Sequence, residues 1–143
     1  MKKLFYLAAI VCCGVLMFTS CAPTTITFQE EDVFGRWQND DNPGEYWVYQ
    51  SSTDESGDYF WGKTWDENDD VQESDLEGDF HGNGWFKWRL DKSDLTQIHM
   101  MTVSEAQVPK VYTITVLTNT TMKYQRYVGG VKESFTFTKV SAE

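Results

Sequence analysis

Cysteine is scarce in this chain of 143 residues, which contains only Cys12, Cys13 and Cys21. Cys12 and Cys13 lie inside an apolar run, residues 4–17, and Cys21 follows that run closely. A domain that begins after the run therefore has a single cysteine and forms no internal disulfide. This excludes a disulfide scaffold, and the remaining cysteine needs another explanation.

Positive charge is also scarce, because 12 Lys and Arg are set against 22 Asp and Glu, and the formal net charge is −10. Binding to nucleic acid requires a basic surface that neutralises phosphates, so the composition argues against it. The same excess of carboxylates argues against attraction of the protein to anionic lipid by charge.

Histidines and the motifs of common catalytic sites are few. The two histidines are His81, in a turn-like sequence, and His99, in a strand-like one. Neither has a second His or a Cys at the spacing of zinc ligands. The chain also contains no Gly-x-Ser-x-Gly elbow and no phosphate-binding loop. We therefore expect a protein that is not an enzyme.

The first 20 residues have the pattern of a signal peptide, with Lys2 and Lys3 before the apolar run and small or polar residues after it. The run is too short for a comfortable transmembrane helix. Residues 18–21, Phe-Thr-Ser-Cys, resemble the lipobox of bacterial lipoproteins. The resemblance implies acyl chains on Cys21 that hold the protein to a membrane of the cell envelope, the outer membrane of a Gram-negative bacterium. The alternative is an ordinary signal peptide that contains a cysteine.

Residues 21–33 are mostly polar and rich in threonine, so we expect the lipidated Cys21 and a short tether here. One domain would follow, over residues 34–143. The segment that precedes Cys21 contains Lys2 and Lys3 and no acidic residue, so its removal would change the formal charge from −10 to −12.

From residue 34 onward, aromatic and β-branched residues alternate with polar ones, and turn residues separate the runs. The connections are short, and Gly129 and Gly130 are suited to a tight hairpin. Eight such strands must close or expose long edges, so we expect an all-β, antiparallel, up-and-down β-barrel. The strands are expected near residues 34–38, 45–50, 58–64, 85–90, 95–101, 110–117, 121–127 and 133–140.

The first of these strands contains a Gly-x-Trp sequence, at Gly35 and Trp37. With the eight expected strands and an aromatic last strand, it resembles the lipocalins, and in particular lipocalin-like bacterial lipoproteins. The resemblance implies that Trp37 packs across the base of the barrel. Lipocalins place a late arginine against this tryptophan, and here Lys139 is the candidate besides Lys132. The resemblance also implies binding of a small, apolar ligand in the barrel.

The mature part of the chain contains six tryptophans. Aromatic side chains could form the apolar walls of a ligand site, and hydroxyl groups could orient the ligand. The expected ligand-binding residues are Trp61, Trp85, Trp88, Tyr112 and Tyr124. The alternative is that large side chains fill the barrel. A filled barrel would act as a protein-interaction module through an acidic, aromatic rim.

The acidic segment of residues 66–77 has oxygen-bearing side chains at the spacing of a calcium-binding EF-hand loop. Val71, however, occupies the position of the turn glycine in that loop, and the flanking residues are not helical in pattern. The segment is either a calcium site, which would assist binding of a carbohydrate, or a solvated acidic loop. The calcium ligands would be Asp66, Asn68, Asp70, Ser74 and Glu77.

Overall fold

The structure, a computed structural model, describes residues 27–69, 72–76, 84–103 and 108–142. The expected signal peptide and the expected lipidation site, Cys21, lie outside these residues, as do Asp70, Glu77 and His81. Within the described residues, no helix combines the length and the apolar character needed to cross a membrane.

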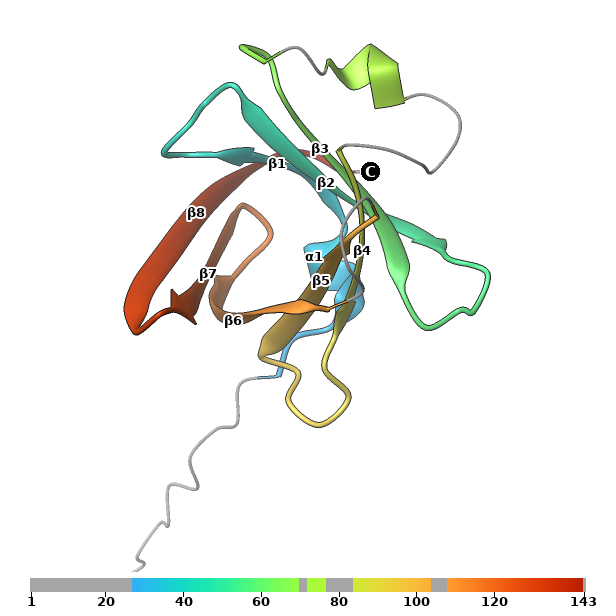
Figure 1. The fold of residues 1–143 in the computed structure, drawn as a ribbon, viewed down its shortest axis with the longest axis vertical. Coiled ribbons are helices and arrows are strands. Elements are labelled where there is room, and N and C mark those ends of the chain that lie inside the picture. The colour runs from blue at the N-terminus through green and yellow to red at the C-terminus, as the bar shows by residue number, and fades with distance from the viewer. Residues whose placement is uncertain (1–26, 70–71, 77–83, 104–107, 143) are drawn as a thin grey trace, which may run out of the picture.

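Eight strands form one closed antiparallel barrel, in which each strand pairs with its neighbours in the sequence and the last strand closes on the first (Figure 1). This confirms the expected all-β, up-and-down barrel, and the architecture is compatible with a lipocalin-like fold. The strands are β1 (Gly35–Asn39), β2 (Glu45–Thr53), β3 (Phe60–Asp66), β4 (Trp85–Leu90), β5 (Gln97–Thr102), β6 (Lys110–Leu117), β7 (Thr121–Val128) and β8 (Val131–Ser141).

Large aromatic side chains fill the interior of the barrel. Alternate residues point inward because successive side chains on a strand lie on opposite faces, and Trp37, Tyr49, Trp88, Tyr124 and Phe137 are almost completely buried there. Their rings meet mainly edge to face, as between Tyr49 and Trp88, whose centroids are 5.3 Å apart. A barrel of eight strands is just wide enough for such side chains, so the interior is a packed core.

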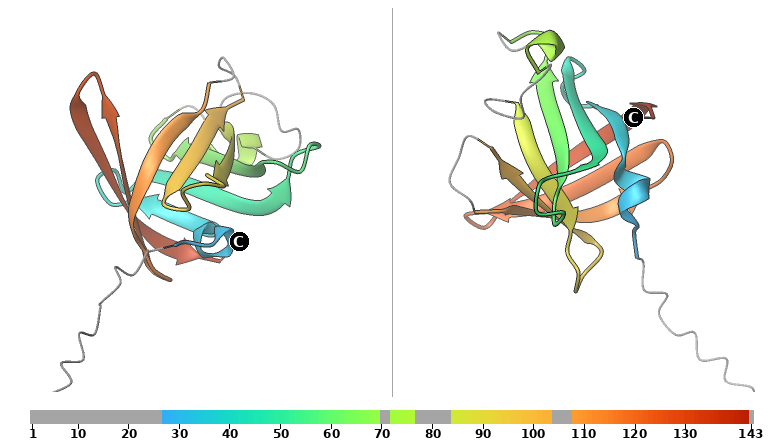
Figure 2. Two further views of the ribbon diagram at one scale, coloured as in Figure 1. Left: turned by 90° about the horizontal axis from the view of Figure 1, so that it is seen from below. Right: turned by 90° about the vertical axis from the view of Figure 1, so that its right-hand side faces the viewer.

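The folded domain begins before residue 34, which corrects the expected end of the tether. Phe28 and Val33 are buried in the main core, and a short helix, α1 (Glu30–Val33), lies beside the barrel (Figure 2). The carbonyl of Val33 accepts a hydrogen bond from Nε1 of Trp37 at 2.8 Å. A helix of one turn is too short to produce a periodic pattern, which is why the sequence did not predict it.

A second hydrophobic cluster lies on the outer face of β2, β3 and β4. Its buried members alternate along the strands with the inward residues, and the 3-10 helix η1 (Glu73–Leu76) contributes Leu76 to it (Figure 1). The buried members are Val48, Trp65, Leu76 and Trp85, and Tyr46, Trp61 and Val103 pack against them. We call this set the outer cluster, and the set inside the barrel the inner cluster.

Candidate binding site at the barrel mouth

The barrel divides the five expected ligand-binding residues between its two faces. Trp88, Tyr112 and Tyr124 belong to the inner cluster, whereas Trp61 and Trp85 belong to the outer cluster. The five residues therefore do not share one face of the sheet. The reason is the strand period of two: Trp85 and Trp88 are three residues apart on β4 and must point to opposite faces. The role of the five residues in ligand binding stays a prediction.

The three inner residues are enclosed by other side chains. Trp88 has no exposed surface, and its Nε1 donates a hydrogen bond to the carbonyl of Trp61 at 3.1 Å. The rings of Tyr112 and Tyr124 contact each other, with centroids 4.9 Å apart. Burial raises the pKa of both hydroxyl groups, so they remain neutral hydrogen-bonding groups at physiological pH.

The remaining space lies at one end of the barrel, which we call the mouth. An apolar pocket of about 110 Å³ opens there between the ends of β3, β4, β5 and β6. Cavities on the order of 150 Å³ accept a benzene ring, so this pocket suits one small apolar group. Of the five expected ligand-binding residues, Trp85 and Tyr112 contribute to it. Its full lining consists of Trp47, Thr64, Gly84, Trp85, Phe86, Met100, Thr102, Lys110 and Tyr112.

A larger polar hollow of about 580 Å³ adjoins the apolar pocket, and the two share Thr64 and Gly84. Three carboxylates lie along the hollow, and among the described residues no Lys or Arg is part of its lining. A bound molecule that reaches from one space into the other would therefore meet an apolar wall and then a negative one. The hollow is lined by Asn42, Glu45, Thr64, Trp65, Asp66, Asp69 and Gly84.

Hydrogen bonds hold two of these carboxylates in place. Glu45 accepts a bond from Nε1 of Trp47 at 2.6 Å and a second from Nδ2 of Asn39 at 2.7 Å. Trp47 itself lines the apolar pocket, so Glu45 links the two spaces through one side chain. The backbone N–H of Asn68 and the amide of Asn42 bond to Asp66, and these bonds lower the pKa of its carboxyl group.

The sequence did not single out most of these mouth residues. Trp47, Phe86 and Met100 form the apolar wall, and Asn42, Glu45 and Asp69 the polar one. The alternation along β2 and β4 could have shown that Trp47 and Phe86 face the interior. The meeting of the ends of four strands depends on closure of the barrel and has no local signal.

The expected calcium ligands do not form a cluster within the described residues. Asp66 uses its carboxylate to bond Asn68 and Asn42, and Ser74 is exposed on η1. Asp70 and Glu77 lie outside the described residues. In the part of the chain that the structure describes, no group of three His, Cys, Asp or Glu residues could hold a metal ion.

The three residues expected at the barrel base lie together. Trp37 on β1 pairs with Lys139 on β8, and Nζ of Lys139 lies 4.9 Å from the centroid of the Trp37 ring. Burial lowers the pKa of Lys139. Gly35 has a φ of 130°, which side chains rarely adopt, and a Cβ there would lie 2.9 Å from the backbone carbonyl oxygen of Ser141, so the position favours glycine.

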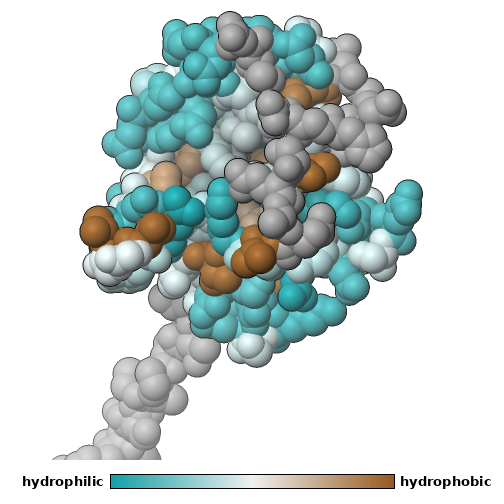
Figure 3. Space-filling model, viewed as in Figure 1, coloured by the Kyte–Doolittle hydropathy of each residue, from teal (hydrophilic) through white to brown (hydrophobic). Residues whose placement is uncertain are grey.

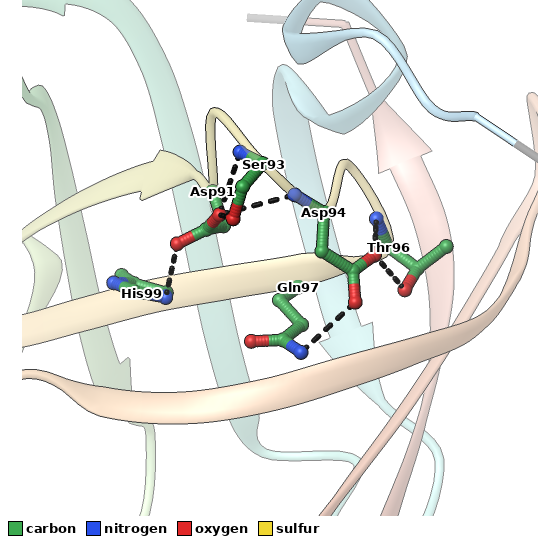
Figure 4. Close-up of polar contacts among 6 residues, drawn as sticks. All are labelled: Asp91, Ser93, Asp94, Thr96, Gln97 and His99. Atoms are coloured by element: carbon green, nitrogen blue, oxygen red, sulfur yellow. Dashed lines mark hydrogen bonds and ion pairs between the residues drawn. The ribbon is translucent and has the colours of Figure 1, made fainter.

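The end of the barrel opposite the mouth contains a tightly bonded turn between β4 and β5 (Figure 4). Asp91 accepts bonds from Ser93 and from the backbone N–H of Asp94, and Nε2 of His99 lies 3.2 Å from its other oxygen. The bonds from Ser93 lower the pKa of Asp91 to about 2. All these partners belong to one hairpin, so the Asp91–His99 pair closes a turn.

Comparisons of the chain with protein-family models, with curated proteins and with solved structures found no match. The class of the protein is therefore defined by its own geometry, as a filled eight-stranded antiparallel barrel with a small pocket at its mouth.

Proposed function

We propose that this protein is a lipid-anchored binding protein of the cell envelope that belongs to the lipocalin-like lipoproteins. Its mouth would bind a small molecule that has one apolar group next to a cationic or hydrogen-bond-donating group. The observation that carries the proposal is the contact between the 110 Å³ apolar pocket and the acidic hollow, which share Thr64 and Gly84. The role is binding without catalysis.

The filled interior limits the size of the ligand. Large apolar molecules need a deep cavity, whereas here the mouth offers space for one small group. A protonated amine suits the other side, because Glu45, Asp66 and Asp69 are the charged residues of that lining. We expect a dissociation constant of roughly 100 µM, or about −5.5 kcal/mol, for a small aryl amine.

Tryptophan fluorescence can test this proposal, because Trp47 and Trp85 line the pocket. The two probes are phenethylamine and 3-phenylpropionate, which share an aryl group and differ in charge. We expect the amine to change the fluorescence at concentrations at least about tenfold lower than the carboxylate does. Tighter binding of the carboxylate would contradict the charge preference and would point to Lys110. No response to either probe would contradict the pocket.

A matched pair of variants separates the two parts of the site. Met100→Trp would fill the apolar pocket and should abolish binding of the amine. Glu45→Gln keeps the shape of the side chain while removing its charge. It should weaken binding of the amine more than it weakens binding of the uncharged probe 2-phenylethanol. Glu55→Gln changes an exposed carboxylate of the β2–β3 turn that lines neither space, and it should change nothing.

The filled interior also favours a second candidate function, that of a protein-interaction module. Inward aromatic residues occur on seven of the eight strands, with β5 contributing Ile98 and Met100 instead. The acidic, aromatic rim would then contact a protein partner. Photo-crosslinking from position 67, exposed just beyond β3, distinguishes the two. A crosslink to one protein that phenethylamine does not displace would favour the module.

A further inference from the structure

The exposed large hydrophobic side chains of the described residues all lie in the last third of the chain. Monomeric soluble proteins rarely gather such side chains on one part of their surface unless that part makes a contact. Three of them surround a single turn, the one between β7 and β8. The exposed set is Val108, Val111, Tyr127, Val128, Val131 and Val140.

The turn between β7 and β8 stands out from the barrel. The two strands pair as far as Val128 with Val131, and Gly129 and Gly130 form the turn with φ values of 58° and 81°. A Cβ built on either glycine has no contact within 4 Å. Figure 2, left, shows this hairpin extending beyond the neighbouring strand β6, and Figure 3 shows hydrophobic side chains at its end. We call residues 127–132 the apolar tip.

The charge of the chain is divided in the same way. Of its 22 Asp and Glu residues, only Glu133 and Glu143 follow residue 107, whereas five of its 12 Lys and Arg residues do. Glu133 is paired with Arg126 at the base of the tip, and Lys132 lies opposite Tyr127 within it. The acidic character that the composition predicts is therefore concentrated in the rest of the molecule.

We propose that the apolar tip inserts into the headgroup region of an anionic lipid bilayer and orients the barrel on it. This rests on the proposed anchor at Cys21. Thr27, the first described residue, is six positions after Cys21, and an extended segment of that length spans about 21 Å. A barrel tethered so closely remains next to the lipid surface, so even a weak second contact would be populated.

The chemistry of the tip favours lipid over a protein partner. A stable protein interface buries about 800 Å² on each side and needs a complementary shape, whereas a projecting turn with three large apolar side chains offers a small, convex surface. A bilayer requires no complementary shape. Val128 and Val131 face the same way and would enter the acyl boundary, Tyr127 suits the headgroup level, and Lys132 would meet anionic phosphates.

The hairpin turn between β2 and β3 provides a matched control. Its exposed positions 55–58 are Glu, Ser, Gly and Asp, so it presents negative charge and no large apolar side chain. Because Cys21 is the single cysteine after residue 20, its acylation leaves an introduced cysteine as the one reactive thiol. An environment-sensitive fluorophore can thus be attached at Val131→Cys or at Glu55→Cys of the processed chain, which begins at Cys21.

The labelled, acylated proteins are reconstituted in vesicles of phosphatidylcholine, either alone or with roughly 30 mol per cent of the anionic lipid phosphatidylglycerol. We expect the label at 131 to shift to shorter wavelength and to be quenched by spin-labelled lipid, more so with phosphatidylglycerol, while the label at 55 does neither. Lys132→Glu should lower the equilibrium constant between inserted and free label roughly 25-fold, because the charge changes by two and each unit near the surface is worth a factor of about five.

This experiment tests the proposed anchor and the proposed insertion of the tip independently. Flotation of the vesicles reports whether the protein is anchored, whereas the label reports only the tip. If the protein does not float, Cys21→Ser is combined with each introduced cysteine so that the label remains specific. Excess vesicles are then added to this unanchored protein and the same label is read. Equal responses at positions 55 and 131, or no response at 131, would overturn the proposal. A shift at 131 that requires added envelope protein would also overturn it, in favour of a protein partner.

Discussion

Inside the barrel, aromatic rings contact mainly other rings, and among the described residues only Trp37 and Tyr112 also meet a cation, Lys139 and Arg126 respectively. On the outer face of β2, β3 and β4, cationic side chains lie over most of the rings, which also contact one another. In the inner cluster, Tyr49 meets Phe86 and Trp88 edge to face. In the outer cluster, the guanidinium of Arg36 lies 4.7 Å from the ring centroids of both Tyr46 and Trp65. The same residue types are thus buried in two different ways.

The difference follows from where water can reach. The inner cluster is enclosed by the sheet, so apolar groups complete most of its packing, because a charge placed inside it would carry a large desolvation penalty. The outer cluster has one layer above it, where long cationic side chains cover the rings and keep their charges near water. Arg36 and Lys63 both form ion pairs with Glu73 of η1, at 3.2 and 3.6 Å. These ion pairs hold in place the side chains that cover the outer cluster.

The largest effect is expected for Trp37→Ala, which removes a ring of the inner cluster. The free energy of unfolding should fall by about 3–5 kcal/mol, because the enclosed barrel cannot collapse into the space. The carbonyl of Val33 also loses its partner. Denaturant titration measures the change, and Trp37→Phe should lose less. A loss no larger than that of Thr113→Ala, an exposed position, would contradict the enclosed core.

A smaller effect is expected for Trp65→Ala in the outer cluster, about 2–3 kcal/mol. Trp65 is only 4% exposed, but η1 and the side chain of Arg36 can settle into the space that the ring leaves. The same titration compares the two variants, with Trp65→Phe as the control. A loss equal to that of Trp37→Ala would show that the outer face is as rigid as the interior.

Gly62→Ala tests how completely the interior is filled. A Cβ at Gly62 would lie 2.3 Å from the ring of Phe86, and that residue is 2% exposed and so has little room to move. We expect a loss of about 1–2 kcal/mol from overpacking. Gly57→Asn is the control, because its surroundings are open and asparagine tolerates positive φ. An unchanged stability for Gly62→Ala would mean that the interior has unused space.

The smallest effect is expected for Asp54→Asn, about 1 kcal/mol at pH 7. Burial alone would raise the pKa of Asp54, but hydrogen bonds from Lys87 and Ser56 outweigh it and lower the pKa from 3.8 to about 2. Lys87 also lies over the Trp61 ring. Since the pKa is lower in the folded state, this stabilisation is present above about pH 4 and is lost as the pH falls toward 2.

The predicted loss of the Asp54 stabilisation at low pH can be checked by measuring the free energy of unfolding from pH 7 to pH 2. The difference between wild type and Asp54→Asn should narrow between pH 4 and pH 2, whereas the difference between wild type and Trp37→Phe should not. A pH-independent effect of Asp54→Asn would contradict the charged character of the outer cluster.

Local sequence patterns predicted much of the fold. Alternation predicted all eight strands, and the Gly129-Gly130 turn has the positive φ values that its sequence predicts. Except for the long connection between β3 and β4, residues 67–84, the connections are short and leave each strand only its neighbour as a partner. The lipid anchor, the signal peptide and the binding of a ligand remain predictions of sequence patterns.

The sequence by itself therefore determined the strands and most of their order, because these depend on neighbours within a few residues. The pairing of Trp37 with Lys139 joins the first and last strands, and it was expected from the resemblance to lipocalins. The contacts that form when the barrel closes were visible only in the tertiary structure. It turned Trp61 and Trp85 outward, drew Phe28 and Val33 into the core, and joined an apolar pocket to an acidic hollow at the mouth. Such contacts join residues far apart in the chain, and no local pattern encodes them.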